Sequence, residues 1–259
     1  RVLVKAYPQP SEQYGETVCV AAITEDGSRL LRLYPVRFRN LDPEQRFKRF
    51  DLIEANAWQD SRDGRPESYK VIEDSLKLLP DSRRLSTAEK VRLWYPHVSP
   101  TIADLRCRNV EQKISLGIVR PEPESVRFSW ERIEDVGNQE REEVATLYKQ
   151  QSLIESELKP LPTPEYAFRY RFRSGEDKPF MKIHDWEVQA TFHNYRRVYG
   201  STDIALDKML EQYQEKMPQQ NLHFIMGTMK RRPRQFIIIG VLRTTEDVKA
   251  ATAQQSLDL

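Results

Sequence analysis

The chain has 259 residues, and its 41 Lys and Arg nearly balance its 39 Asp and Glu, which leaves a net charge of +2. Charged residues make up 31% and hydrophobic residues 39%, a balance typical of a folded protein rather than a disordered one. No apolar run approaches the roughly 20 residues that a membrane-spanning helix needs. Two cysteines exclude a disulfide framework and a Cys-rich zinc site, and the absence of an export signal at the start leads us to expect a cytoplasmic protein.

Residues 1–121 are expected to form a β-rich module. Strands are predicted at 2–6, 16–24, 29–36, 50–58 and 114–119. The Asp26-Gly27 pair between the second and third of these is typical of a hairpin turn. Asp42-Pro43 predicts a short helix, and Ser86 with Glu89 forms a capping-box pattern that predicts a helix to about residue 95. Several short strands with few helices favour a small barrel-like module.

An acidic connector is predicted at 122–165, and its apolar residues fall on one helical stripe from about 139 to 158. The simplest interpretation is a helix packed across the two flanking blocks. A helix that binds a protein partner is the alternative. The tail after residue 243, at 244–259, is polar and is expected to fray.

Residues 166–243 are expected to form an α+β module. A strand at 166–173 is followed by a helix that begins after Asp185 and ends at Gly200. A second helix is predicted from 201 to about 217, and two strands at 222–227 and 236–242 close the module. The expected fold is therefore α+β, with the β-rich N-terminal module packed on a C-terminal antiparallel sheet with two helices.

The charge is unevenly distributed, with a net charge of +4 over 1–121, −5 over 122–159 and +6 over 166–243. The sharpest local feature is the sequence from Phe168 to Arg173. Because side chains alternate along a strand, Arg169, Arg171 and Arg173 are expected on one face, about 6.6–6.8 Å apart. That spacing suits the phosphates of an extended nucleic-acid strand, although a solvated strand face is the plainer interpretation.

A second basic feature is the turn between the last two apolar strands. Its cations are Lys230, Arg231, Arg232 and Arg234. A hairpin with four cations at its tip could bind phosphates, or it could simply keep the turn soluble. Together, the Arg row and this hairpin lead us to expect a nucleic-acid-binding protein, with DNA and RNA both open.

A Mg²⁺-dependent nuclease is the enzymatic alternative, since such enzymes hold the metal with carboxylates and use a lysine nearby. Asp81 followed by Glu111 and Lys113 matches this pattern loosely. No cofactor is expected unless this alternative holds, and no metal site is otherwise predicted. The two cysteines differ in setting: Cys19 lies in an apolar strand and is interpreted as an inert core thiol, whereas Cys107 lies between two arginines.

Short motifs of the chain resemble a family of bacterial proteins of unassigned function. They are Ile183–Glu187, Gly227-Thr228, Phe236–Gly240, Arg32–Pro35 and Arg65–Tyr69. Relatives are expected to carry paired cysteines before the Asp-Trp-Glu stretch, where this chain has Ser174–Phe180, so the resemblance implies no metal site here. It implies a shared fold and no activity. A protein-interaction subunit that uses the 139–158 helix remains a third possibility.

Overall fold

The computed structural model describes residues 1–11, 15–80, 85–135, 164–229 and 232–245. In these residues the N-terminal part forms a sheet with the strand order β1-β3-β4-β7-β6, and β2 pairs with β3. Its elements are β1 (Val2–Lys5), β2 (Gln9–Ser11), β3 (Gly15–Ile23), β4 (Leu30–Val36), β6 (Ala57–Trp58) and β7 (Ser68–Val71), with the separate pair β5 (Ile53–Glu54) and β8 (Lys77–Leu78). This sheet is not a closed barrel within the described residues.

Two further sheets form the C-terminal part. The first has the order β15-β14-β10-β9, and the second has the order β11-β12-β13. Their strands are β9 (Val98–Ser99), β10 (Leu116–Val119), β11 (Arg127–Arg132), β12 (Tyr166–Arg171), β13 (Phe180–Lys182), β14 (His223–Met229) and β15 (Arg232–Leu242). β10 pairs with β14 although it precedes residue 121, so this sheet crosses the predicted module limit. The division into modules stays a prediction.

The described helices are α1 (Thr87–Trp94), α2 (Ile102–Gln112), α4 (Trp186–Tyr199) and α5 (Thr202–Leu210). Ser86 and Glu89 form the predicted capping box of α1, and α4 begins after Asp185 and ends at Gly200, whose φ of 66° is the left-handed conformation that favours glycine. The predicted helix of 201–217 is α5 continued by one stretch of π-helix, Glu211–Lys216. α2 was not predicted, although Thr101 and Asp104 form a capping box at its start.

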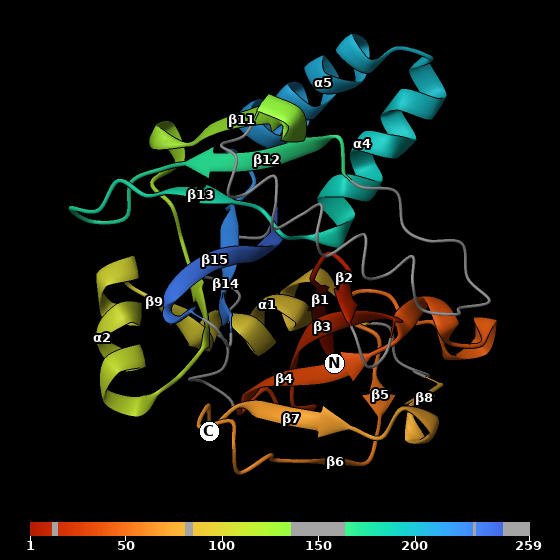
Figure 1. The fold of residues 1–259 in the computed structure, drawn as a ribbon. Helices are drawn as coiled ribbons and strands as arrows, with labels where there is room; N and C mark the ends of the chain where they lie inside the picture. Colours follow the sequence, from red (N-terminus) through yellow and green to blue (C-terminus); the bar gives the residue numbers. More distant parts are fainter. Residues whose placement is uncertain (12–14, 81–84, 136–163, 230–231, 246–259) are drawn as a thin grey trace.

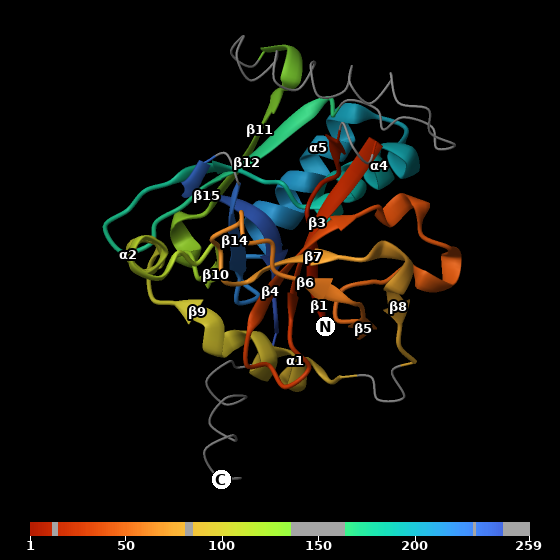
Figure 2. The same ribbon diagram turned by 60° about the horizontal axis from the view of Figure 1, so that its bottom comes forward.

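The α+β class is confirmed, and Figures 1 and 2 show how the parts are stacked. The β11-β12-β13 sheet with α4 and α5 lies at one end, the N-terminal sheet lies at the other, and β14 and β15 run between them. Strand β1 packs so closely on β15 that a Cβ at Gly240 would lie 2.7 Å from Val4 Cγ2. The predicted helix of 139–158 and residues 246–259 of the predicted tail lie outside the described residues. Thr244, at the start of that tail, is buried.

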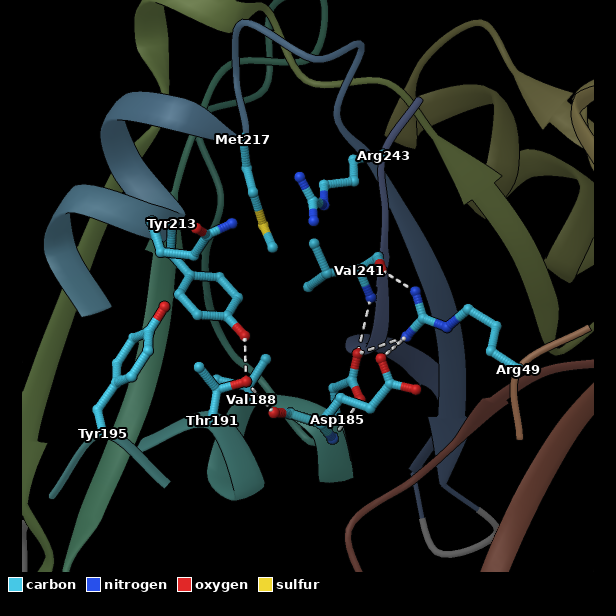
Figure 3. A pocket seen from close by; sticks show the side chains of 11 residues that line it. Arg49, Asp185, Val188, Thr191, Tyr195, Tyr213, Met217, Val241 and Arg243 are labelled. Carbon is cyan, nitrogen blue, oxygen red and sulfur yellow. Dashed lines mark hydrogen bonds and ion pairs between the residues drawn. The ribbon is translucent and has the colours of Figure 1, made fainter. Parts of the chain in front are cut away.

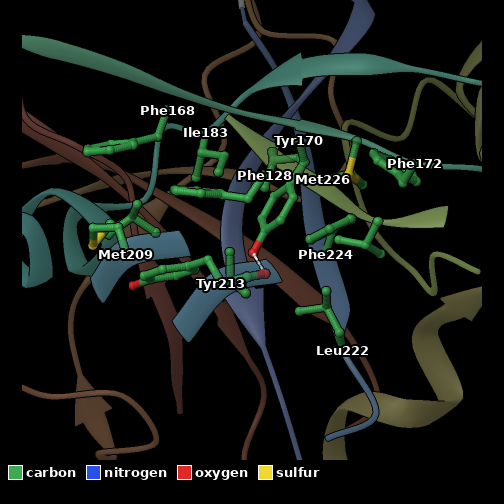
Figure 4. Packing of buried hydrophobic residues seen from close by; sticks show 14 of the residues in the cluster. Phe128, Phe168, Tyr170, Phe172, Ile183, Met209, Tyr213, Leu222, Phe224 and Met226 are labelled. Atoms are coloured by element: carbon green, nitrogen blue, oxygen red, sulfur yellow. Dashed lines mark hydrogen bonds between the residues drawn. The ribbon is translucent and has the colours of Figure 1, made fainter. Parts of the chain in front are cut away.

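The largest core cluster is rich in aromatic residues and lies between the β11-β12-β13 sheet, strand β14 and helices α4 and α5 (Figure 4). Phe168 and Tyr170 are fully buried, and the ring of Phe224 lies 4.8 Å from that of Tyr170. The Tyr170 hydroxyl donates a hydrogen bond to the carbonyl oxygen of Tyr213 at 2.8 Å. Burial therefore anchors one face of β12 and directs the alternate residues of the strand outward.

Candidate functional site

The outward face of β12 is the first candidate site. Phe168, Tyr170 and Phe172 are buried, and the intervening arginines project from the opposite face, as the alternation predicts. Across the sheet, Arg171 lies opposite Arg127 on β11 and opposite Phe180 on β13. The neighbouring register position places Arg169 opposite Lys182. The face thus combines four cations with an aromatic ring.

Carboxylates lie beside two members of the row, a feature that strand alternation alone did not reveal. Arg169 Nη2 lies 3.6 Å from Glu131 Oε2, and Arg173 Nη2 lies 2.6 Å from Glu122 Oε2. Within the described parts of the chain, Arg171 has no carboxylate at ion-pair distance. Like charges that face each other across strands are destabilising. Arg127, opposite Arg171, donates through Nη1 to the carbonyl oxygens of Glu124 and Val126, at 2.9 and 2.8 Å.

Phe180 is the exposed aromatic residue of this face. Its side chain is 49% exposed. The guanidinium carbon of Arg171 lies 4.8 Å from the ring centroid, and that of Arg169 lies 5.6 Å from it. A large apolar side chain in this position gains little from burial, but it offers a flat surface on which a base could stack between cations.

The basic hairpin lies in a different sheet from the Arg row. Arg232 and Arg234 are exposed at the start of β15, whereas Lys230 and Arg231 lie outside the described residues. Asn109 of α2 donates a hydrogen bond to the carbonyl oxygen of Pro233 at 3.1 Å, which ties the hairpin to that helix.

The nuclease candidates are not brought into one described cluster. Asp81 lies outside the described residues. Glu111 is exposed in the last turn of α2, and Lys113 ends that helix with a left-handed φ of 58°. Among the described residues, no group of three or more His, Cys, Asp or Glu side chains is placed to hold a metal ion. The nuclease alternative therefore remains a prediction.

A pocket of about 300 Å³ lies between the N-terminus of α4, the end of β15 and the residues that follow α5. Figure 3 shows Asp185 and Val188 at its base and Met217 and Arg243 at the opposite end. The Tyr213 hydroxyl donates to Thr191 Oγ1 at 3.3 Å. The remaining lining residues are Arg49, Glu187, Tyr195, Gln212 and Val241.

Asp185 is the buried carboxylate of this pocket. It is 1% exposed, caps α4 by accepting from the Glu187 N–H at 2.8 Å, and accepts from the Val241 N–H at 3.0 Å. Burial raises the pKa of Asp185 to about 6, against the opposing effect of the Arg49 guanidinium. A carboxyl group with this pKa changes its protonation state close to neutral pH.

Arg49 was not identified from the sequence as a partner of Asp185. Its guanidinium lies 3.5 Å from Asp185 Oδ2 and 2.9 Å from Glu187 Oε2, and it donates to the Val241 carbonyl oxygen at 2.5 Å. With these contacts, Arg49 joins the N-terminal part to α4 and β15. The predicted role of Asp185 as an N-cap is confirmed, but its partner lies 136 positions away, where no local pattern indicates it.

No helix in the described residues is long and apolar enough to cross a membrane.

Comparison with known proteins identifies two domains, both of unknown function. The family model described as domain of unknown function DUF8758 matches residues 1–96, and the model described as domain of unknown function DUF8757 matches residues 98–258. No curated protein and no solved structure matches the chain. Arg49 therefore lies in the first matched region, and its partner Asp185 lies in the second. The predicted membership of a family without an assigned activity is confirmed: the chain belongs to the DUF8757 family.

Proposed function

We propose that this protein binds single-stranded nucleic acid on the outward face of the β11-β12-β13 sheet. The observation that supports the proposal best is the exposed ring of Phe180 beside the guanidinium of Arg171, 4.8 Å away. Phosphates would pair with Arg171 and Arg127, and a base would stack on Phe180. A single strand can present both groups to a sheet, whereas the bases of a duplex are stacked inside it.

The charge of the face supports contacts with phosphate rather than with specific bases. Arg169 and Arg173 are partly neutralised by Glu131 and Glu122. No carboxylate of the described residues lies at ion-pair distance from Arg171. An incoming phosphate would therefore neutralise the charge of Arg171 more readily than the charges of the other two arginines. Arg232 and Arg234 would add phosphate contacts only where a strand is long enough to reach the second sheet. A cytoplasmic location is part of this proposal.

We expect Arg171→Ala and Phe180→Ala to weaken binding in different ways. Losing one phosphate contact shrinks the slope of log K against log salt by about 0.7 for a single strand. Losing a stacking ring costs about 1–3 kcal/mol and leaves the salt slope unchanged. Fluorescence polarisation with labelled single- and double-stranded DNA and RNA over a series of salt concentrations measures both quantities.

Arg29→Ala is the matched control, because Arg29 is exposed in the turn between β3 and β4, away from the proposed face. It removes the same charge and should leave the salt slope unchanged. Absence of binding at low salt would refute the proposal. A gel of the same samples with Mg²⁺, and of Asp81→Ala and Glu111→Ala, tests the nuclease alternative.

A further inference from the structure

The pocket of Figure 3 has no role in the proposed binding of nucleic acid. None of its lining residues belongs to β11, β12 or β13. Its volume of about 300 Å³ lies at the lower end of the range found for small-molecule sites. It lies where the two matched regions meet, because Arg49 comes from the first region and the other lining residues come from the second. The cavity is therefore large enough for a small organic molecule.

One wall of the pocket is built by an uncommon turn of helix. Glu211–Lys216 forms a π-helix, and the N–H of Met217 donates to the carbonyl oxygen of Gln212 at 3.1 Å. In an α-helix, residues five apart point about 140° away from each other. The wider π-turn brings Gln212 and Met217 closer to one side, and both line the pocket. Such turns are rare in proteins, and they occur frequently at functional sites.

The charges of the pocket are balanced at one end only. The carboxylates of Asp185, at the base, and of Glu187 both lie at ion-pair distance from Arg49. Arg243 lies at the opposite end (Figure 3). Its Nη1 donates to the neutral side chain of Gln220, and no carboxylate of the described residues lies at ion-pair distance from it. The charge that still lacks a counter-charge is therefore positive, which favours an anionic ligand over a cationic one.

The walls between these two ends suit a partly apolar molecule. Figure 3 shows Val188, Met217 and Val241 around the space, with Tyr195 at its side. The Tyr195 hydroxyl and the side-chain amide of Gln212 make no hydrogen bond to another described residue, although both residues line the pocket. A few polar groups on a partly apolar wall are typical of sites that orient a small ligand.

We propose that this pocket binds a small organic acid. The carboxylate of the ligand pairs with the guanidinium of Arg243, and its apolar part packs against Val188, Met217 and Val241. A guanidinium and a carboxylate can form two parallel hydrogen bonds, which fixes the direction of the ligand. The two protein carboxylates at the other end repel an anion, so they disfavour the reverse orientation.

Three probes that share a benzyl group test which charge the pocket accepts: phenylacetate, 2-phenylethanol and phenethylammonium. The methyl group of Met217 reports on the pocket itself. Its NMR signal is assigned with Met217→Leu, in protein labelled at the methionine methyl groups. We expect phenylacetate to shift this signal saturably, with a Kd in the millimolar range for so small a ligand. The neutral alcohol should bind about fivefold more weakly, and the cation more weakly still.

Arg243→Gln removes the charge and keeps a polar side chain. It should weaken the binding of phenylacetate about fivefold and leave that of 2-phenylethanol unchanged. Arg197→Gln is the matched control, because Arg197 is exposed on α4 but does not line the pocket, and it should change neither affinity.

Three results would overturn the proposal. In the first, none of the probes shifts the Met217 signal saturably. In the second, phenylacetate binds no more tightly than phenethylammonium. In the third, Arg243→Gln binds phenylacetate as tightly as the wild type does.

Discussion

Asp185→Ala is expected to lower the free energy of unfolding by about 2–4 kcal/mol near pH 4, where the wild-type carboxyl group is protonated. The substitution removes the N-cap of α4, which is worth about 0.5–2 kcal/mol. It also leaves the buried N–H of Val241 without its acceptor, at a cost of about 1–3 kcal/mol. Helix α4, which lines one side of the pocket, would lose the residue that caps its N-terminus.

The same variant should reveal the pH dependence that burial imposes. The pKa of Asp185 is raised from 3.8 to about 6 in the folded state. The folded protein therefore binds more protons than the unfolded chain between these values, and the contribution of Asp185 to stability is lost as pH rises from about 4 to about 6. The loss amounts to about 3 kcal/mol.

Urea denaturation of wild type and Asp185→Ala at several pH values measures this effect. The difference in the free energy of unfolding between wild type and Asp185→Ala should shrink as pH rises from about 4 to about 6, and it should become small near pH 7. Asp203→Ala is the control: this carboxylate is exposed in the first turn of α5, and its loss should cost under about 1 kcal/mol throughout. A difference between wild type and Asp185→Ala that does not change with pH would contradict the prediction.

Phe224→Ala is expected to cost about 3–5 kcal/mol of stability, because truncating a buried aromatic ring removes its transfer free energy and leaves a cavity. Phe224 on β14 is fully buried. Its ring lies 4.8 Å from the rings of Tyr170 and Phe172, which belong to the other C-terminal sheet or follow it. The substitution should therefore loosen the contact between the two C-terminal sheets.

Phe180→Ala is the matched comparison, with the same change of side chain at an exposed position. Its effect on stability should stay within about 0.5 kcal/mol. Measuring the denaturation midpoints of Phe224→Ala and Phe180→Ala under the same conditions tests both predictions. A loss below about 1 kcal/mol for Phe224→Ala would show that the core cluster does not join the sheets as tightly as the ring distances indicate. An unchanged stability for Phe180→Ala also makes its binding measurement interpretable.

The contact between Arg49 and Asp185 has a broader consequence, because it joins the two regions that match separate family models. β1 and β15 pack together at Val4 and Gly240, where only a glycine allows the observed approach. The Arg49–Asp185 ion pair and the close packing of β1 on β15 both link the two matched regions. We therefore expect the stabilities of these regions to be coupled rather than independent.

Elements whose ends depend on near neighbours could be predicted from local sequence patterns. Asp185 and Gly200 mark the ends of α4, and Ser86 with Glu89 marks the start of α1, because capping involves residues within one turn. The alternation from Phe168 to Arg173 identified the buried and outward faces of β12, since strand periodicity is local. α2 was not predicted, although Thr101 and Asp104 form a capping box at its start.

The contacts between side chains from distant segments depend on the packing of the whole chain. Glu131 and Glu122 reach the Arg row from segments outside β12, Arg49 reaches Asp185 across 136 positions, and Arg32 reaches Cys19 from the neighbouring strand. Each of these contacts depends on strand register and on how sheets pack, which are set by the burial of apolar surface over the whole chain. Local patterns therefore indicated where helices and strands begin and end, whereas the chemistry of both candidate sites arose from packing between distant segments.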